Sequence, residues 1–387
     1  MMSICENARS GPFNPLMTPG VKYLTVDDAH ALAKGAAFLG AGGGGDPYTT
    51  LLQFEALLQA GKRVGLVELS SVPDDALVAP CGWMGAPTVS LEKLPNGREA
   101  VMGLRKLEEI KGQKVFGVFP MEIGGSNGLA PLLLAAECDI PVIDCDGMGR
   151  AFPESQMVVF NIYGCSASPV VITDEIGNCI VMETATNHEE ERIARLLSIA
   201  MGGSCHVIDY SGSGYQMKQN AIRGTVSLAI NIGYALLGAR GKGQDPFQAL
   251  LASLSASSYY RYGGVLFDGK VVNLERETSG GFAVGRAVLE TFDGKDSLEV
   301  GFRNENLVAR VNDEIRGMVP DILTFLDRET ADPVTTENLR YGQRLKLIGV
   351  GVPPTLRTDA ALAVLGPRAF AIAEQYRPIE EINAWLP

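Results

Sequence analysis

The chain has 387 residues, of which 46% are hydrophobic and 20% are charged, and its formal net charge is −12. This is the composition of an ordinary globular protein, and the length allows two domains. The negative charge argues against nucleic acid or an anionic membrane as a partner, because both require a basic protein surface. No stretch approaches the roughly 20 apolar residues of a membrane span, and no apolar secretory signal is visible. We therefore expect a soluble, cytoplasmic protein, whose composition is compatible with a homo-oligomer.

The cysteine and histidine patterns argue against several kinds of site. The seven cysteines are widely spaced and contain no CxxC pair, so neither a zinc ribbon nor a thioredoxin-like redox site is indicated. Reduced thiols are the expectation for a cytoplasmic protein. The three histidines, His30, His188 and His206, have no metal-ligand spacing, although His206 in a strand can reach a site in space.

The first segments of the chain read as an arm followed by two helices. Residues 1–22 are polar and rich in glycine, proline and asparagine, which predicts an extended arm. Thr25 can cap a first helix, and Asp46 and Pro47 suit the start of a second. The glycine run that ends at Gly45 joins helix to helix, so it is neither a Rossmann loop nor a P-loop, and we predict no nucleotide cofactor. Its amides, with Asp46, can still form a nest that contacts a small ligand.

From residue 64 onward, short apolar strands alternate with helices. Strands are predicted at 64–68, 77–81, 115–119 and 142–145, and helices at 99–110 and 128–137. This alternation is typical of a mainly parallel sheet that is covered on both faces. Three further strands and then three helices are predicted at 158–163, 170–173, 179–182, 189–201, 217–239 and 246–254.

The last third of the chain changes character after Ser258. Short segments are separated by turn signals such as Asp268-Gly269, a pattern typical of an antiparallel barrel or sandwich. These segments are 259–266, 270–276, 285–291, 298–303, 307–311 and 344–350. We therefore predict an α/β protein with a three-layer α/β/α N-terminal domain and an antiparallel, β-barrel-like C-terminal domain. The domains are placed at residues 23–257 and 258–387, with the break between 177 and 258.

Three loops at the ends of predicted strands carry unusual side chains, and ligands of open α/β sheets bind at such ends. The loop after 77–81 contains Glu92 and Lys93, a carboxylate and an ammonium side by side. A solvated ion pair on the surface is the structural alternative, because exposed pairs are common and inert.

The loop after 115–119 contains Glu122 and then Gly124, Gly125, Ser126 and Asn127 at the start of a helix. The amides of such a loop can bind an anion or a polarised carbonyl group. Ser126 or Asn127 can instead cap the helix. Glu122 is the more informative residue, because a carboxylate at a strand end has no capping role.

The end of the strand 142–145 and the loop after it contain Asp144 and Asp146, which alternate along the strand and can face the same side, followed by Arg150 and Glu154. Such a group suits a divalent metal, a general acid and base, or recognition of a substrate carboxylate by Arg150. A buried salt-bridge network that stabilises the turn is the alternative.

Seven motifs follow one another along the chain, and they extend over the range from about Tyr23 to Pro378. They are Leu39–Pro47, Gly85–Thr88 with Glu92-Lys93, Glu122–Asn127, Asp146–Glu154, Gly281–Gly285, Thr336–Gly342 and Gly366–Phe370. In this order they resemble the motifs of the S-methyl-thiohydantoin desulfurase-like family. The resemblance implies an α/β domain followed by a β-barrel domain.

The resemblance also implies an activity, the removal of sulfur from a 2-thiohydantoin-type ring to give the hydantoin, with a dependence on a divalent metal. Zinc is one candidate, with Asp144, Asp146 and Glu122 as its ligands. One of these carboxylates would activate water, directly or through the metal. The amides of residues 124–127 and Lys93 would stabilise the charge that develops on sulfur.

Other interpretations of the same residues stay open. Cys81 as a nucleophile that accepts the sulfur is a rival to hydrolysis by water. A ring-opening cyclic amidohydrolase, or a partner subunit of one, would use the same loops. A ligand-binding or regulatory protein without catalysis would keep the carboxylates as a structural network. In each case the partner is a small molecule.

Overall fold

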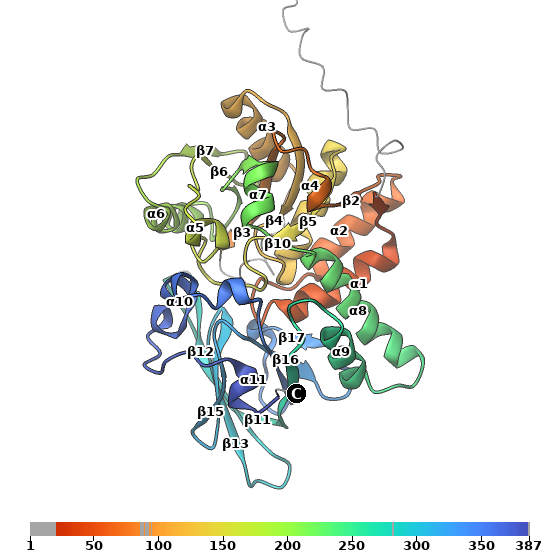
Figure 1. Cartoon of the computed structure of the whole chain (residues 1–387), viewed down its shortest axis with the longest axis vertical. Helices are drawn as coiled ribbons and strands as arrows, with labels where there is room; N and C mark the ends of the chain where they lie inside the picture. Colours follow the sequence, from red (N-terminus) through yellow and green to blue (C-terminus); the bar gives the residue numbers. More distant parts are fainter. Residues whose placement is uncertain (1–20, 86–88, 90–92, 94, 281, 386–387) are drawn as a thin grey trace, which may run out of the picture.

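The computed structural model describes residues 21–85, 89, 93, 95–280 and 282–385 (Figure 1). The chain forms an α/β domain, drawn in the upper part of Figure 1, and a β-rich domain below it. Most of the predicted arm at residues 1–22 lies outside the described residues. In the part of the chain that is described, no helix is long and apolar enough to cross a membrane, and every cysteine is a free thiol.

The α/β domain is built on one mixed sheet. Neighbouring strands lie in the order β1-β2-β5-β4-β3-β8-β6-β7. The strands β2, β5, β4 and β3 are parallel, whereas β8, β6 and β7 continue the sheet with antiparallel pairing. The prediction of a mainly parallel sheet therefore holds for only four of its ten strands. The strands are β1 (Lys22–Tyr23), β2 (Gly65–Glu68), β3 (Leu77–Gly85), β4 (Val115–Pro120), β5 (Val142–Asp146), β6 (Val170–Thr173), β7 (Cys179–Met182), β8 (Ser204–Ile208), β9 (Gly212–Ser213) and β10 (Ile222–Arg223).

The helices of this domain pack against the sheet and against one another. Contacts of α4 with β3, β4 and β5, of α3 with β6 and β8, and of α8 with β5 bury the apolar strands. The helices are α1 (Val26–Leu39), α2 (Tyr48–Gln59), α3 (Glu99–Lys111), α4 (Ala130–Cys138), α5 (Val159–Ile162), α6 (Asn187–Ala200), α7 (Gly214–Asn220), α8 (Thr225–Gly241) and α9 (Pro246–Ser255).

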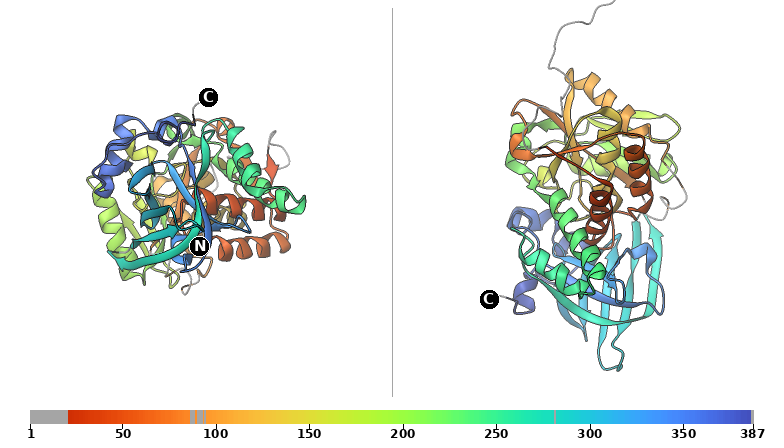
Figure 2. Two further views of the ribbon diagram at one scale, coloured as in Figure 1. Left: turned by 90° about the horizontal axis from the view of Figure 1, so that it is seen from below. Right: turned by 90° about the vertical axis from the view of Figure 1, so that its right-hand side faces the viewer.

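The helices α1 and α8 cross with their backbones in contact. A Cβ atom on Gly35 would lie 1.8 Å from the carbonyl oxygen of Ala229, and one on Gly233 would lie 1.8 Å from that of Ala31. Glycine is therefore required at both positions, because a side chain has no room there. The residues 225–255, green in the side view of Figure 2, lie where the two domains meet.

Two predictions for the middle of the chain are wrong. The segment 158–163 is the short helix α5, held by hydrogen bonds such as Ile162 N to Val158 O at 3.1 Å, despite its β-branched and aromatic residues. Tertiary packing of Phe160 against Phe119 and Tyr210 overrides the local preference. The predicted helix 217–239 is divided into α7 and α8 by β10, which pairs with the end of β5.

The C-terminal domain is one antiparallel sheet with the order β15-β14-β13-β12-β11-β18-β16-β17. It curls so that β14 lies next to β16, but no hydrogen-bonded ladder closes it among the described residues. The predicted antiparallel class is confirmed, and a closed barrel is not. The elements are β11 (Gly263–Ser279), β12 (Phe282–Glu290), β13 (Ser297–Arg303), β14 (Glu305–Val311), β15 (Glu314–Met318), β16 (Ile322–Asp327), β17 (Pro333–Val334), β18 (Arg344–Val350), α10 (Asp359–Leu365) and α11 (Ile379–Ile382).

The predicted turn at Asp268-Gly269 is wrong, because both residues lie inside β11. Gly269 pairs with Leu345 of β18. A Cβ atom there would lie 2.3 Å from the carbonyl oxygen of Glu290, so glycine permits the close approach of β12. Asp268 is satisfied by an ion pair with Arg328 at 2.8 Å.

Candidate active site

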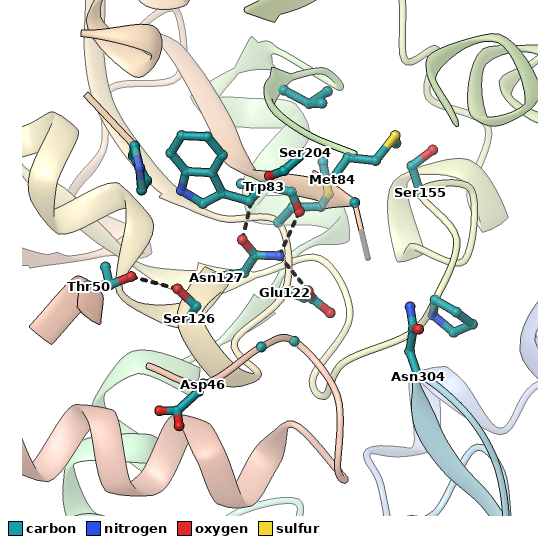
Figure 3. A pocket seen from close by; sticks show the side chains of 18 of the residues that line it. Asp46, Thr50, Trp83, Met84, Glu122, Ser126, Asn127, Ser155, Ser204 and Asn304 are labelled. Atoms are coloured by element: carbon teal, nitrogen blue, oxygen red, sulfur yellow. Dashed lines mark hydrogen bonds between the residues drawn. The ribbon is translucent and has the colours of Figure 1, made fainter. Parts of the chain in front are cut away.

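A cavity of about 210 Å³ lies where strand ends of the α/β domain meet the start of β14 (Figure 3). It is lined by the end of β3, by the loop after β4, by the start of α2 and by Asn304 and Glu305 of the C-terminal domain. Trp83 and Met84 provide an apolar wall together with Phe152. The site therefore belongs to both domains, and the strand-end prediction located two of its walls.

Glu122 is the carboxyl group with the most defined setting in this cavity. Its Oε1 accepts a hydrogen bond from Nδ2 of Asn127 at 2.6 Å, and its Oε2 accepts one from the amide of Phe152 at 3.2 Å. Burial, with a further contribution from the nearby charge of Asp146, raises the pKa of Glu122 to about 7. Glu122 can therefore exchange a proton near neutral pH, as a general acid or base must.

Asn127 holds the two lining strand ends together rather than capping the helix. Its side-chain oxygen accepts from the amide of Trp83 at 2.7 Å, and its amide nitrogen donates to the carbonyl of Trp83 at 3.1 Å. Figure 3 shows this amide between the end of β3 and Glu122. The contacts fix the carboxyl group of Glu122 relative to Trp83.

Ser126 faces the cavity beside Thr50, and their hydroxyl oxygens are 2.6 Å apart. Residues Gly124–Gly128 match the pattern Gly-x-Ser-x-Gly of a nucleophilic serine, a signal that the sequence reasoning missed. Serine becomes a nucleophile only beside a base. Among the described residues, the side-chain partner of Ser126 is Thr50, which is not a base, and no histidine lines the cavity.

The glycine-rich segments pack against each other instead of surrounding a ligand. A Cβ atom on Gly125 would lie 2.4 Å from the carbonyl carbon of Gly44, and the amide of Ser126 donates to the carbonyl of Gly44 at 2.8 Å. Gly124 and Gly125 are not in the cavity wall, whereas Gly45 and Asp46 are. The glycines of both runs thus permit a backbone-to-backbone contact.

Asp146 lies outside the cavity wall and organises the loops behind it. Its Oδ2 accepts hydrogen bonds from the amides of Ile123, Met148 and Gly149 at 2.9, 3.2 and 2.7 Å. The residue is fully buried, and burial raises its pKa to about 7. Asp146 therefore acts on the site through the loop that carries Glu122.

Asp144 also lies outside the cavity wall. Its carboxylate accepts from the amide and the hydroxyl of Ser227 at 3.0 and 2.5 Å, at the N-terminus of α8. A carboxylate is favoured at this end of a helix. Asp144 and Asp146 are therefore not paired in one site as predicted, and each accepts its own set of hydrogen bonds from a different part of the chain.

These carboxyl groups do not fit a shared metal ion. The oxygens of Asp144 and Glu122 and one oxygen of Asp146 already accept protein hydrogen bonds. Across the described ranges, no group of three or more histidine, cysteine, aspartate or glutamate side chains is arranged to hold a metal. The set of ligands predicted from the sequence is therefore not assembled.

Arg150 is fully buried and is directed to the C-terminal domain. Its guanidinium donates to the carbonyls of Pro320 and Asp321 at 3.2 and 2.7 Å and to that of Asn306 at 3.4 Å. It does not line the cavity. This position gives Arg150 a structural role at the domain boundary, not the expected contact with a substrate carboxylate.

Lys93 lies at the rim of the cavity, and Glu92 lies outside the described residues. The ammonium group of Lys93 pairs with Glu175 at 2.8 Å and donates to the carbonyl of Ser204 at 2.9 Å and to that of Met201. It therefore ties the loop after β3 to the segment before β8. Its charge is already compensated in the site.

Cys81 and His206 are both buried outside the cavity wall. Burial raises the pKa of the Cys81 thiol far above its usual value, so a thiolate nucleophile is not favoured there. Burial lowers the pKa of His206 to about 3, and its ring stands edge-on to Trp83 at 5.3 Å between centroids. His206 thus acts as a neutral wall behind Trp83.

Asp209 and Glu305 are lining carboxyl groups that the sequence reasoning missed. Asp209 directly follows β8, a strand that the sequence analysis indicated only by placing His206 in one. Burial and the charges of Glu190 and Glu191 raise the pKa of Asp209 well above its usual value. The sequence feature that could have identified Asp209 as a site residue was its position directly after an apolar strand. Glu305 had no such signal, since only the fold brings β14 to the cavity.

The cavity thus contains two kinds of buried carboxyl group beside an apolar wall. Glu122 can exchange a proton near neutral pH, and the pKa of Asp209 is raised well above its usual value. Enzymes commonly obtain an acid and a base from two titratable groups whose different surroundings shift their pKa values apart. The methionine and tryptophan side chains suit a polarizable sulfur atom.

Comparisons with known proteins agree with this architecture. A family model described as S-Me-THD-like, N-terminal domain, matches residues 27–184, and one described as S-Me-THD-like, C-terminal domain, matches residues 185–379. A crystal structure of a protein from Chromobacterium violaceum has a TM-score of 0.78 and 22% sequence identity, and the alignment covers 92% of this chain and 100% of that one. At this identity the likeness shows the fold alone. No curated protein matches the chain.

Proposed function

The chain belongs to the S-methyl-thiohydantoin desulfurase-like family, and we propose that it hydrolyses the exocyclic carbon–sulfur bond of a 2-thiohydantoin-type ring. The products would be the hydantoin and sulfide. The observation that supports this proposal best is Glu122, a buried carboxyl group with a pKa of about 7 in the wall of a half-apolar cavity.

The reaction exchanges sulfur for oxygen and requires one base and one acid. Glu122 takes a proton from water as the water oxygen bonds to the ring carbon, and the electron pair of the C=S bond moves to sulfur. Asp209 protonates the sulfur. The carbon–sulfur bond then breaks with its electron pair on sulfur, hydrosulfide leaves, and the carbonyl forms as its oxygen gives the remaining proton to Asp209. Every atom comes from the substrate and one water molecule.

The apolar part of the wall supports the same assignment. Trp83, Met84 and Met121 line the cavity, and thioether and aromatic groups tolerate a sulfur atom better than charged groups do. Asn127 keeps Glu122 beside this wall. The electrophilic carbon would therefore lie between the base and a sulfur-compatible surface.

The test is to incubate the purified protein with a 5-alkyl-2-thiohydantoin and to measure sulfide and ring absorbance in the same sample. We expect sulfide release with conversion to the hydantoin ring. Ring opening without sulfide would instead support the cyclic amidohydrolase. Binding without any conversion of the ring would contradict both enzymatic assignments.

A further inference from the structure

One serine of the cavity wall has a carboxyl group as its hydrogen-bond partner. The serines of the described wall are Ser126, Ser155 and Ser204, and all of them are labelled in Figure 3. The hydroxyl of Ser155 donates to Oε2 of Glu190, in helix α6, at 2.6 Å. Within the described residues, the hydroxyls of the other two have no contact with a carboxyl group. Ser155 is therefore the lining serine that is placed beside a base.

Glu190 is a fully buried carboxyl group that lacks a cation. Its neighbour Glu191 is paired with Arg195 at 2.8 Å, but in the part of the chain that the structure describes no lysine or arginine pairs with Glu190. Its Oε1 has no hydrogen-bond partner among the same residues. Glutamate is rarely buried without a paired cation. A buried carboxyl group whose side-chain contact is a serine of a cavity is thus a candidate for chemistry.

Helix α6 also holds the loop that carries Ser155. The backbone amide of Ser155 donates to Oε2 of Glu191 at 2.8 Å. Arg195 donates to the carbonyl of Pro153 at 2.9 Å and to Oε1 of Glu191 at 2.8 Å. These contacts keep the hydroxyl of Ser155 beside Glu190 before any ligand enters, which is the preorganisation that a catalytic pair requires.

The surroundings of Glu190 strengthen it as a base. Burial raises its pKa, and the charge of Glu191 acts in the same direction, against the opposing effects of the Ser155 hydrogen bond and of Arg195. A carboxylate whose pKa is raised takes up a proton more readily than an exposed glutamate does. A serine hydroxyl becomes a nucleophile when such a base accepts its proton.

We propose that Ser155 is a nucleophile activated by Glu190, and that the cavity hydrolyses small carboxylic esters through an acyl group on Ser155. This activity goes beyond the proposed function and does not depend on it. The cavity of about 210 Å³ and its apolar wall of Trp83 and Met84 suit a short acyl chain. Esters are the expected class because an alcohol leaves more readily than an amine.

The reaction is balanced by the ester and one water molecule. The oxygen of Ser155 bonds to the carbonyl carbon as Glu190 takes the hydroxyl proton, and the ester C–O bond breaks with its electron pair on the alcohol oxygen. The alcohol leaves with the proton from Glu190. Water then bonds to the acyl carbon and gives one proton to Glu190. Ser155 leaves with that proton, and the carboxylic acid is released.

The test uses a fluorophosphonate, which forms a stable bond with an activated serine oxygen. The purified full-length protein is incubated with this compound, and peptide mass spectrometry locates the adduct. We expect the adduct on Ser155 and none on Ser126 or Ser204, which share the cavity but have no base beside them. The unmodified protein should release 4-nitrophenol from 4-nitrophenyl acetate, and the modified protein should not.

A pair of matched variants in α6 tests the base. Glu190→Gln can still accept the hydrogen bond of Ser155 but cannot take its proton, so modification should slow by about 10²- to 10⁴-fold. Glu189→Gln removes the neighbouring, solvent-exposed carboxylate, which is paired with Arg192. This control should keep the rate of modification within about twofold, because an exposed ion pair contributes little.

A hydrogen bond that serves only to stabilise the loop would give different results. Absence of an adduct on the unchanged protein, under conditions that modify a serine esterase, would overturn the proposal whether or not the variants fold. An adduct on Ser126 or Ser204 instead, or an unchanged rate in a folded Glu190→Gln protein, would overturn it as well. Sulfide release is measured separately, so none of these outcomes decides the desulfurase assignment.

Discussion

The side-chain amide of Asn127 donates a 2.6 Å hydrogen bond to the carboxyl group of Glu122. The same side-chain amide of Asn127 is hydrogen-bonded to the backbone amide and the backbone carbonyl of Trp83. Glu122, the candidate base, is therefore held in a fixed position relative to the apolar wall. This relationship holds a carboxyl group of raised pKa in the wall of the cavity. Asn127 thus serves the site by orienting Glu122.

Replacing Glu122 by glutamine should remove the base and retain the fold. We expect sulfide release to fall by about 10²- to 10⁴-fold, the usual effect of losing a general base. Since glutamine can no longer accept both hydrogen bonds, stability should fall by only about 1 kcal/mol. The control is Glu175→Gln, a lining residue paired with Lys93 at the rim, which should keep activity within a few-fold.

The pH dependence of the rate should follow the two carboxyl groups. Glu122 is a base only when ionised, so kcat/KM should rise with pH until about pH 7. Asp209 is an acid only when protonated, so the rate should decline where it loses its proton, and its raised pKa moves that decline to higher pH. Asp209→Asn should lower the rate and remove the alkaline decline. A wild-type profile that is flat from pH 5 to pH 9 would contradict both roles.

Asp146 should matter for stability more than for chemistry. Asp146→Ala removes the acceptor of three backbone amides and should destabilise the protein by about 3 kcal/mol. Asp146→Asn keeps an acceptor oxygen, so it should fold and keep turnover. Denaturant unfolding and sulfide release on the two variants separate these effects. Loss of turnover in a stable Asp146→Asn protein would instead assign this residue to the chemistry.

Asp146 should also make the stability of the folded protein depend on pH. Burial raises the pKa of Asp146 from 3.8 to about 7, so the folded state keeps a proton that the unfolded state loses. The free energy of unfolding should therefore decrease as the pH rises from about 4 to about 7, by an amount on the order of a few kcal/mol. Glu122 contributes in the same direction. Asp146→Asn should flatten this dependence in denaturant titrations at several pH values.

The crossing of α1 and α8 offers a test of the fold itself. Gly233→Ala places a Cβ atom 1.8 Å from the carbonyl oxygen of Ala31 and should destabilise the protein by about 3 kcal/mol or more. Gly238→Ala, in the same helix, meets no atom within 4 Å and should stabilise it by up to about 1 kcal/mol. Thermal unfolding of both variants checks the difference. Similar melting temperatures would contradict the close crossing.

Local patterns in the sequence determined most of the elements and one side chain of the cavity wall. The cap at Thr25, the alternation of strands and helices from residue 64, and the antiparallel segments after Ser258 were predictable because they depend on neighbours in the chain. Glu122 was predictable as a site residue for a related reason, since a carboxylate at a strand end has no local function.

Tertiary structure alone decided which groups share the cavity. Asp144 and Asp146 alternate along β5, yet they have different hydrogen-bond donors. Asp144 accepts from Ser227 at the start of α8, whereas Asp146 accepts from backbone amides of two loops. Arg150 is adjacent in sequence but is directed into the other domain. Glu305 lines the same cavity as Glu122, although the two residues are more than 180 positions apart in the chain. Such partners depend on which surfaces are buried together, and that information is spread over the whole chain instead of residing in any motif.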